Sequence, residues 1–254
     1  MFFAGTIVNS LMIDRLEKKW AARCLFLLVI TISICSNLWP MGDTDYSNLI
    51  NWMNEVSSNP SIFSSGKIVL PIITTGNLIY FAFTLAVVFV YILIAILYSR
   101  IFVGEKSGQR LSQSCLSFLK RLPVLVAFYI LVSIPVGFLS GIVPIAAVFV
   151  VPALFFSPIL ITLEKKNPID AITLSYRHTK GVKFSIFWDL LTLFCMYQTA
   201  EWLFLLIMPN ASSAGILLHA FFTGYFILSF GRMSGIFYDR LLMHPAPEPP
   251  VTPN

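Results

Sequence analysis

The chain has 254 residues, of which 57% are hydrophobic and 11% are charged, and its formal net charge is +5. Soluble domains carry about 25% charged residues because their surfaces face water, so this composition excludes an ordinary soluble fold. The positive charge does not indicate nucleic-acid binding, because the basic residues lie in short clusters between apolar runs. That distribution is typical of the loops of membrane proteins.

The first 67 residues predict a surface helix, a span and a second surface helix. Residues 1–20 carry apolar side chains at helical spacing and end in a charged cluster, which predicts an amphipathic helix at the membrane surface. The apolar run 21–39 predicts a first span, retained rather than cleaved as a signal peptide. In the polar stretch 40–67, apolar residues recur at helical spacing after Asp43 and Asp45, which predicts a short helix at the outer interface.

The next two apolar runs predict three further spans. The run 68–99 is too long for one untilted helix, and its polar group at 74–77 predicts a break before a second span at 78–98. An amphipathic pattern at 111–119 predicts a surface helix. The run that follows is long enough for a third span at 122–139 and a fourth at 142–163. The turn between them is predicted at four helix-interrupting residues, Gly137, Ser140, Gly141 and Pro144.

The remaining apolar runs predict a fifth span at 184–208 and a sixth at 215–237, joined by a short polar loop. The proline-rich tail 244–254 is expected to be disordered. The domain organisation is therefore a surface helix at 1–20, a membrane domain at 21–243 and this tail.

The basic residues predict the orientation of these spans. Sixteen of the 17 Lys and Arg residues fall on one side of a six-span arrangement, and only Lys67 falls on the other. Under the positive-inside rule, both termini then lie in the cytoplasm. The predicted fold is an all-α polytopic membrane bundle of about six spans, with short interfacial helices.

The loop after the fourth span carries a helix-start motif. Asn167 is a favourable N-cap, Pro168 suits the first helical position, and Asp170 lies where a carboxylate favours the helix dipole. Gly181 is expected to end the helix. The motif predicts a short interfacial helix between two spans.

The same region resembles a motif of bacterial integral membrane proteins, in which a proline-interrupted span ends in glutamate and an interfacial helix follows. The matching residues are Pro158, Glu164, Pro168, Asp170, Ala171, Ser175, Lys180 and Gly181. This group includes the six-span YciC-like family and the membrane domain attached to some glycerophosphodiester phosphodiesterases. The resemblance implies a membrane fold in a bacterial inner membrane and carries over no catalytic residue, since the phosphodiesterase domain has no counterpart in this chain.

Ionisable residues within predicted spans are the candidate functional residues, because a charge in hydrocarbon is costly unless it is paired. Glu201 and His219 lie near the outer ends of the fifth and sixth spans, and Asp189 and Arg232 near the inner ends. We predict that Glu201 contacts His219 and that Asp189 approaches Arg232. These couples are interpreted either as polar locks between helices or as parts of a proton or ion relay.

No Walker A, GxSxG or HExxH signature occurs, and no Cys or His spacing is that of a metal site. We therefore expect no catalytic residue, no metal and no cofactor. The predicted function is that of a non-enzymatic multi-pass inner-membrane protein with an accessory role in organising, assembling or regulating a membrane process. The alternative is a small-solute or ion transporter or channel that uses Glu201 and His219.

The expected partners are the lipid bilayer, anionic lipid headgroups at the basic loops, and a membrane-protein partner or a second copy of the chain. Gly231 and Gly235 have GxxxG spacing, which permits a span to pack closely against a neighbouring helix.

Overall fold

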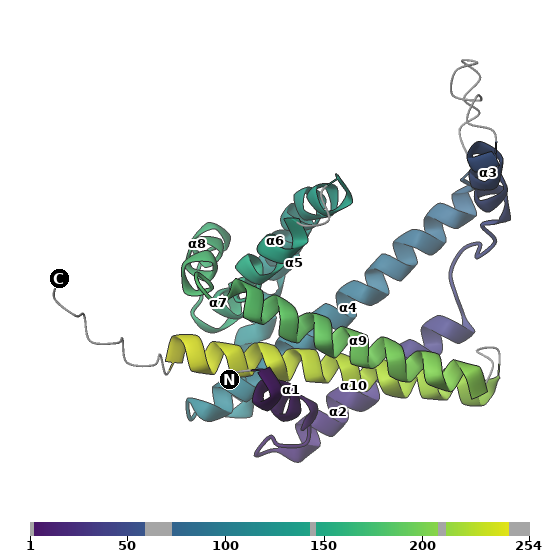
Figure 1. The fold of residues 1–254 in the computed structure, drawn as a ribbon. Helices are drawn as coiled ribbons and strands as arrows, with labels where there is room; N and C mark the ends of the chain where they lie inside the picture. Colours follow the sequence, from purple (N-terminus) through teal and green to yellow (C-terminus); the bar gives the residue numbers. More distant parts are fainter. Residues whose placement is uncertain (1–2, 59–72, 143–145, 208–211, 244–254) are drawn as a thin grey trace.

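The structure, a computed structural model, describes residues 3–58, 73–142, 146–207 and 212–243, and every regular element in them is a helix (Figure 1). The helices are α1 (Phe3–Leu11), α2 (Lys19–Leu38), α3 (Ser47–Ser58), α4 (Thr75–Lys106), α5 (Leu111–Ile142), α6 (Ala146–Leu154), α7 (Ser157–Leu163), α8 (Pro168–His178), α9 (Lys183–Ile207) and α10 (Ser213–Tyr238), with a π-helical turn η2 (Asp239–Met243) at its end. The predicted all-α class is confirmed. Within the described residues four helices, namely α2, α4, α5 and α10 with η2, are long and apolar enough to cross a membrane.

The helices pack against one another around the C-terminal parts of α4 and α10, and several of them separate away from this region. Figure 1 shows α9 and α10 side by side, while α4 and the α5–α6 pair leave them in different directions. Buried residues are concentrated at 94–104 of α4 and 228–238 of α10, together with most of α7. The N-terminal half of α4 instead exposes Leu78, Phe81 and Leu85. Apolar helix surface of this extent is stable in lipid rather than in water.

Helix α4 begins at the break that the sequence predicts. The Asn77 backbone N–H donates to Thr74 Oγ1 over 3.1 Å, and the Thr74 backbone N–H donates to Asn77 Oδ1 over 3.1 Å, so the two residues form a capping box. The Asn77 amide also donates to the carbonyls of Asp43 (3.0 Å) and Asp45 (2.9 Å), which attaches the segment before α3 to the start of α4. One side chain therefore fixes both the start of a long helix and the position of its neighbour.

The predicted short helix after the first span is present as α3. Asp45 Oδ1 accepts a hydrogen bond from the Ser47 N–H over 2.8 Å, at the first residue of α3. This backbone hydrogen bond stabilises the carboxylate and lowers the pKa of Asp45 below its usual value. The helix thus begins two residues after Asp45, as expected for an acidic residue close to a helix N-terminus.

Helix α5 contradicts two predictions. A separate surface helix at 111–119 and a turn at Gly137–Gly141 are both wrong, because one helix runs continuously from Leu111 to Ile142. Glycine within a helix costs only about 1 kcal/mol relative to alanine, so two glycines do not end a helix whose backbone hydrogen bonds remain intact. Pro144 lies outside the described residues.

The predicted fourth span is divided by a break between α6 and α7. Pro158 has no N–H, and its ring clashes with the carbonyl four residues earlier, so the helix cannot continue through Phe155 and Phe156. The Phe156 N–H freed by this break donates to Ser175 Oγ of α8 over 3.1 Å. The break therefore creates the attachment point for the helix that follows.

Helix α1 is shorter than the predicted surface helix and packs against α9 and α10. It ends at Leu11, and the last carbonyls of a helix lack partners within it. The Tyr225 hydroxyl donates to the Leu11 carbonyl over 2.5 Å, and the Tyr98 hydroxyl donates to the Ile13 carbonyl over 2.6 Å. Side chains of α4 and α10 thus bind the end of α1 and the turn that follows.

Candidate functional site

The candidate site lies between α9 and α10, near the short connection that joins them. Ser212 caps α10 by accepting the Gly215 N–H on its side-chain oxygen over 3.0 Å. Glu201 lies six residues before the end of α9, and His219 lies six residues after the start of α10. At 1.5 Å per residue both are about 9 Å from the connection, so antiparallel packing brings them to the same depth.

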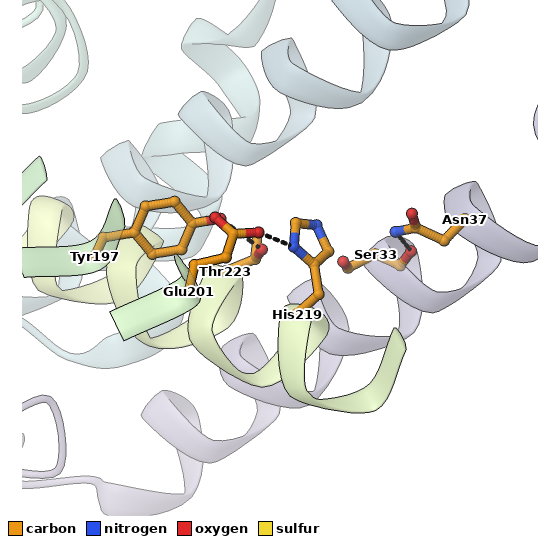
Figure 2. Close-up of polar contacts among 6 residues, drawn as sticks. All are labelled: Ser33, Asn37, Tyr197, Glu201, His219 and Thr223. Carbon is orange, nitrogen blue, oxygen red and sulfur yellow. Dashed lines mark hydrogen bonds and ion pairs between the residues drawn. The ribbon is translucent and has the colours of Figure 1, made fainter. Parts of the chain in front are cut away.

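Glu201 and His219 are in direct contact. Oε1 of Glu201 lies within hydrogen-bond distance of Nδ1 of His219, and the two side chains are 20% and 33% exposed (Figure 2). A protonated Nδ1 donates to the carboxylate, which satisfies one polar atom of each residue among apolar neighbours. The sequence therefore identified two residues that the structure brings together.

A second polar contact lies one helical turn away. Tyr197 precedes Glu201 by four residues and Thr223 follows His219 by four, and their hydroxyl oxygens are 3.3 Å apart (Figure 2). The Tyr197 ring also stacks on Phe226, with the ring centroids 4.7 Å apart. The two contacts form a short polar ladder along the α9–α10 seam. Four-residue spacing from Glu201 and His219 was the sequence signal that could have found the second rung.

Helix α2, which packs against α10, also carries polar residues. Figure 2 draws two of them, Ser33 and Asn37, and the Asn37 amide donates to the Ser33 carbonyl over 2.8 Å. The Ser33 hydroxyl is buried and has no hydrogen-bond partner among the residues that the structure describes. The hydrogen bonds of the polar ladder thus join α9 and α10, and Ser33 and Asn37 are polar residues of the neighbouring helix α2.

The predicted approach of Asp189 to Arg232 is wrong. Arg232 Nε donates to the Asn9 carbonyl over 2.7 Å, and its Nη1 donates to the Tyr98 hydroxyl over 3.3 Å. The guanidinium also lies 4.9 Å from the ring centre of Phe102. The physical reason is the end of α1, whose terminal carbonyls and negative dipole attract a cation.

Asp189 is buried without a hydrogen-bond partner in the described part of the chain, and the charge that acts on its carboxylate is that of Arg240. It is 1% exposed, and neither of its carboxylate oxygens has a hydrogen-bond partner there. Similar depth on neighbouring helices was insufficient to predict a contact, because it does not specify which face of each helix a residue occupies.

The interfacial motif residues hold α7, α8 and α10 together. Asn167 caps α8 by accepting the Asp170 N–H over 2.8 Å, and its amide donates to the Asp170 carboxylate over 2.7 Å, with Pro168 in the first turn. Ser175 binds the α6–α7 break as described above. Glu164 accepts a hydrogen bond from the Tyr238 hydroxyl over 2.6 Å.

Two further motif positions lie beyond α8. Gly181 has a φ of +86°, a left-handed conformation that glycine adopts without strain. Lys180 is exposed. The roles that the contacts assign to the motif are therefore helix capping and helix packing.

Arg100, which follows the predicted second span in the sequence, lies in the core of the structure. It is 3% exposed and donates to Gln109 Oε1 over 2.7 Å and Ser117 Oγ over 3.0 Å. Within the described residues, no three His, Cys, Asp or Glu side chains come together as metal ligands do. The arrangement of polar groups is thus one of hydrogen-bonded contacts between helices.

Comparison with protein-family models, with curated proteins and with solved structures finds no match for this chain.

Proposed function

We propose that the chain is a non-enzymatic, six-span protein of a bacterial inner membrane, with both termini in the cytoplasm and an accessory role in organising or regulating partner membrane proteins. The spans would be α2, α4, α5, the α6–α7 unit, α9 and α10. Helix α9 has 25 residues and a length of about 37 Å, sufficient for a bilayer core of about 30 Å. The resemblance to YciC-like proteins supports the bacterial setting, and the structural roles of its motif residues agree with a non-catalytic function.

The observation that carries the accessory role is the apolar surface left open where the helices separate. Large apolar side chains are exposed on the N-terminal half of α4 and on α9, including Leu78, Phe81, Trp202 and Leu206. In a bilayer, partner helices pack on such surface through van der Waals contacts. A protein whose helices pack together in one region and expose apolar surface in another is suited to holding partner helices.

The alternative function, a small transporter or channel, is favoured by the polar ladder. Glu201, His219, Tyr197 and Thr223 place exchangeable protons on one seam between apolar helices. Polar groups at such a depth are either helix locks or parts of a pathway. A stability measurement combined with a flux measurement distinguishes the two.

The topology is tested by reporter fusions. Fusions beside Lys67 and within 211–214 are expected to report the outside. Fusions near Arg110, Lys165 and Arg240 are expected to report the cytoplasm, because the basic clusters remain inside. An outside signal at Lys165 would contradict the six-span arrangement.

Replacing Glu201 separates a lock from a relay. In a lock, Glu201→Gln retains stability because an amide still hydrogen-bonds to His219, whereas Glu201→Leu loses about 1–2 kcal/mol of unfolding free energy, measured by denaturation in detergent. Gln198→Leu is the matched control, since it also removes a polar group from α9 but at an exposed position. If Glu201 carries protons, Glu201→Gln instead abolishes pH-dependent solute flux in proteoliposomes at unchanged stability.

A further inference from the structure

A polar cavity lies where the end of α1, the end of α4 and the end of α10 meet. Its volume is about 370 Å³, within the range of small-ligand sites. The turn after α1 contributes Arg15 and Glu17, α4 contributes Glu105 and Lys106, and α10 with η2 contributes Arg232, Asp239 and Arg240. This cavity is separate from the polar ladder, which lies toward the other end of α10.

The lining has four basic and three acidic side chains, so it carries one net positive charge. Two of the acids are already engaged. Asp239 contacts the Lys106 ammonium, and the Glu105 carboxylate accepts the backbone N–H groups of Glu17 (3.0 Å) and Lys18 (3.3 Å). Arg15, Arg232 and Arg240 have no carboxylate partner within salt-bridge distance in the described chain. Guanidinium groups of this kind are suited to binding a tetrahedral oxyanion.

Hydrogen bonds to other residues of the protein hold two of these arginines in position. Arg232 is 6% exposed and bonded to the Asn9 carbonyl and the Tyr98 hydroxyl, and Arg240 Nη1 donates to Thr6 Oγ1 over 2.7 Å. Positioning of this kind lowers the conformational entropy lost when a ligand binds. Arg15 is exposed at the mouth of the cavity.

We propose that this cavity binds a phosphate group, carried either by the headgroup of an anionic phospholipid or by a soluble phosphate compound. A phosphodiester has one negative charge, which balances the one net positive charge of the lining. On the proposed topology the cavity lies at the cytoplasmic membrane surface, where basic pockets between spans bind phospholipid headgroups. The inference rests on the proposed function only for this location, because the charges and the cavity do not depend on it.

The test measures binding of phosphatidylglycerol to the full chain purified in detergent, by native mass spectrometry. The variant Arg15→Gln/Arg240→Gln removes two cavity charges, and the control Lys120→Gln/Lys180→Gln removes two exposed charges elsewhere, so both have the same net charge. Each charge-assisted hydrogen bond contributes about tenfold in affinity, so the cavity variant should bind at least tenfold more weakly than the control, which loses two charges of the basic loops but none of the cavity. Equal binding by both variants would overturn the proposal.

Competition with inorganic phosphate and with glycerol phosphate distinguishes the two sources. If the soluble phosphates displace the lipid only at concentrations far above the dissociation constant of the lipid, the site is assigned to a lipid headgroup. Binding of the soluble phosphates to wild type, but not to the cavity variant, with no retained lipid assigns it to a soluble compound. Because the measurement is made in detergent, its failure is distinct from a failure of the topology reporters. A thermal unfolding curve of each variant establishes that it is folded. The variant Arg240→Lys keeps the charge and should therefore retain most of the lipid binding of the wild type.

Discussion

Replacing Gly231 with alanine is expected to lower the free energy of unfolding by about 1–3 kcal/mol, the usual cost of overpacking a well-filled contact. A Cβ at this position would lie 2.4 Å from the Ala95 carbonyl oxygen and 3.1 Å from the Ala95 carbonyl carbon. These are main-chain atoms of α4, so no side-chain rotation relieves the clash, and α4 and α10 must move apart. Gly231→Leu should cost more, because the larger side chain requires greater separation of the same helices.

Two other glycines of the chain serve as matched controls, compared by denaturation in detergent. Gly5→Ala in α1 should be neutral or slightly stabilising, because a Cβ there meets no atom within 4 Å and alanine favours a helix. Gly224→Ala should fall between the two, since its Cβ would meet side-chain atoms, the Phe26 ring at 3.0 Å and Ile30 at 3.5 Å, rather than main-chain atoms. Equal stability of the Gly5 and Gly231 variants would show that α4 and α10 do not pack through this contact.

This contact also shows which parts of the packing the sequence could predict. The spacing of Gly231 and Gly235 predicted a close approach to a neighbouring helix, and the structure confirms it for both. The identity of the neighbour was not predictable, because small residues permit a close approach without specifying a partner. Helix α4 is adjacent to α10 in space but far from it along the chain.

The sequence was most reliable where local chemistry sets a helix boundary. The break at 74–77 and the Asn167–Pro168 start of α8 were found at their expected positions, because each depends on residues within one turn. The continuity of α5 was missed, since glycines in an apolar helix are tolerated where backbone hydrogen bonds have no better partner.

Of the two residue pairs predicted from the sequence, the structure brings one into contact and not the other. Glu201 and His219 are joined by a connection so short that their depths determine their contact. Asp189 and Arg232 satisfied the same depth argument, but the end of α1 offers Arg232 the Asn9 carbonyl. The packing of α1 against α10 leaves no pattern in the sequence of α10 from which it could be predicted.

Replacing Arg232 with leucine is expected to cost about 2–3 kcal/mol of unfolding free energy, the usual contribution of hydrogen bonds to a charged group. The Asn9 carbonyl and the Tyr98 hydroxyl would each lose a donor, and the cation–π contact with Phe102 would be lost as well. Arg232→Lys should be intermediate, because an ammonium keeps the charge but lacks the planar fork that binds both groups.

Loss of the Arg232 contacts should also weaken the attachment of α1 to α10. This local effect can be measured independently of global stability. Trypsin cleavage at Arg15, between α1 and α2, should become faster in Arg232→Leu than in wild type under native conditions. Asp189→Asn is the control. Neither Asp189 oxygen has a hydrogen-bond partner in the described chain, so this variant should retain both wild-type stability and slow cleavage. A double-mutant cycle between Asp189→Asn and Arg232→Leu should then give a coupling energy near zero. A coupling of 1 kcal/mol or more would mean that the two residues interact in the folded protein and that the end of α1 is not the principal partner of Arg232.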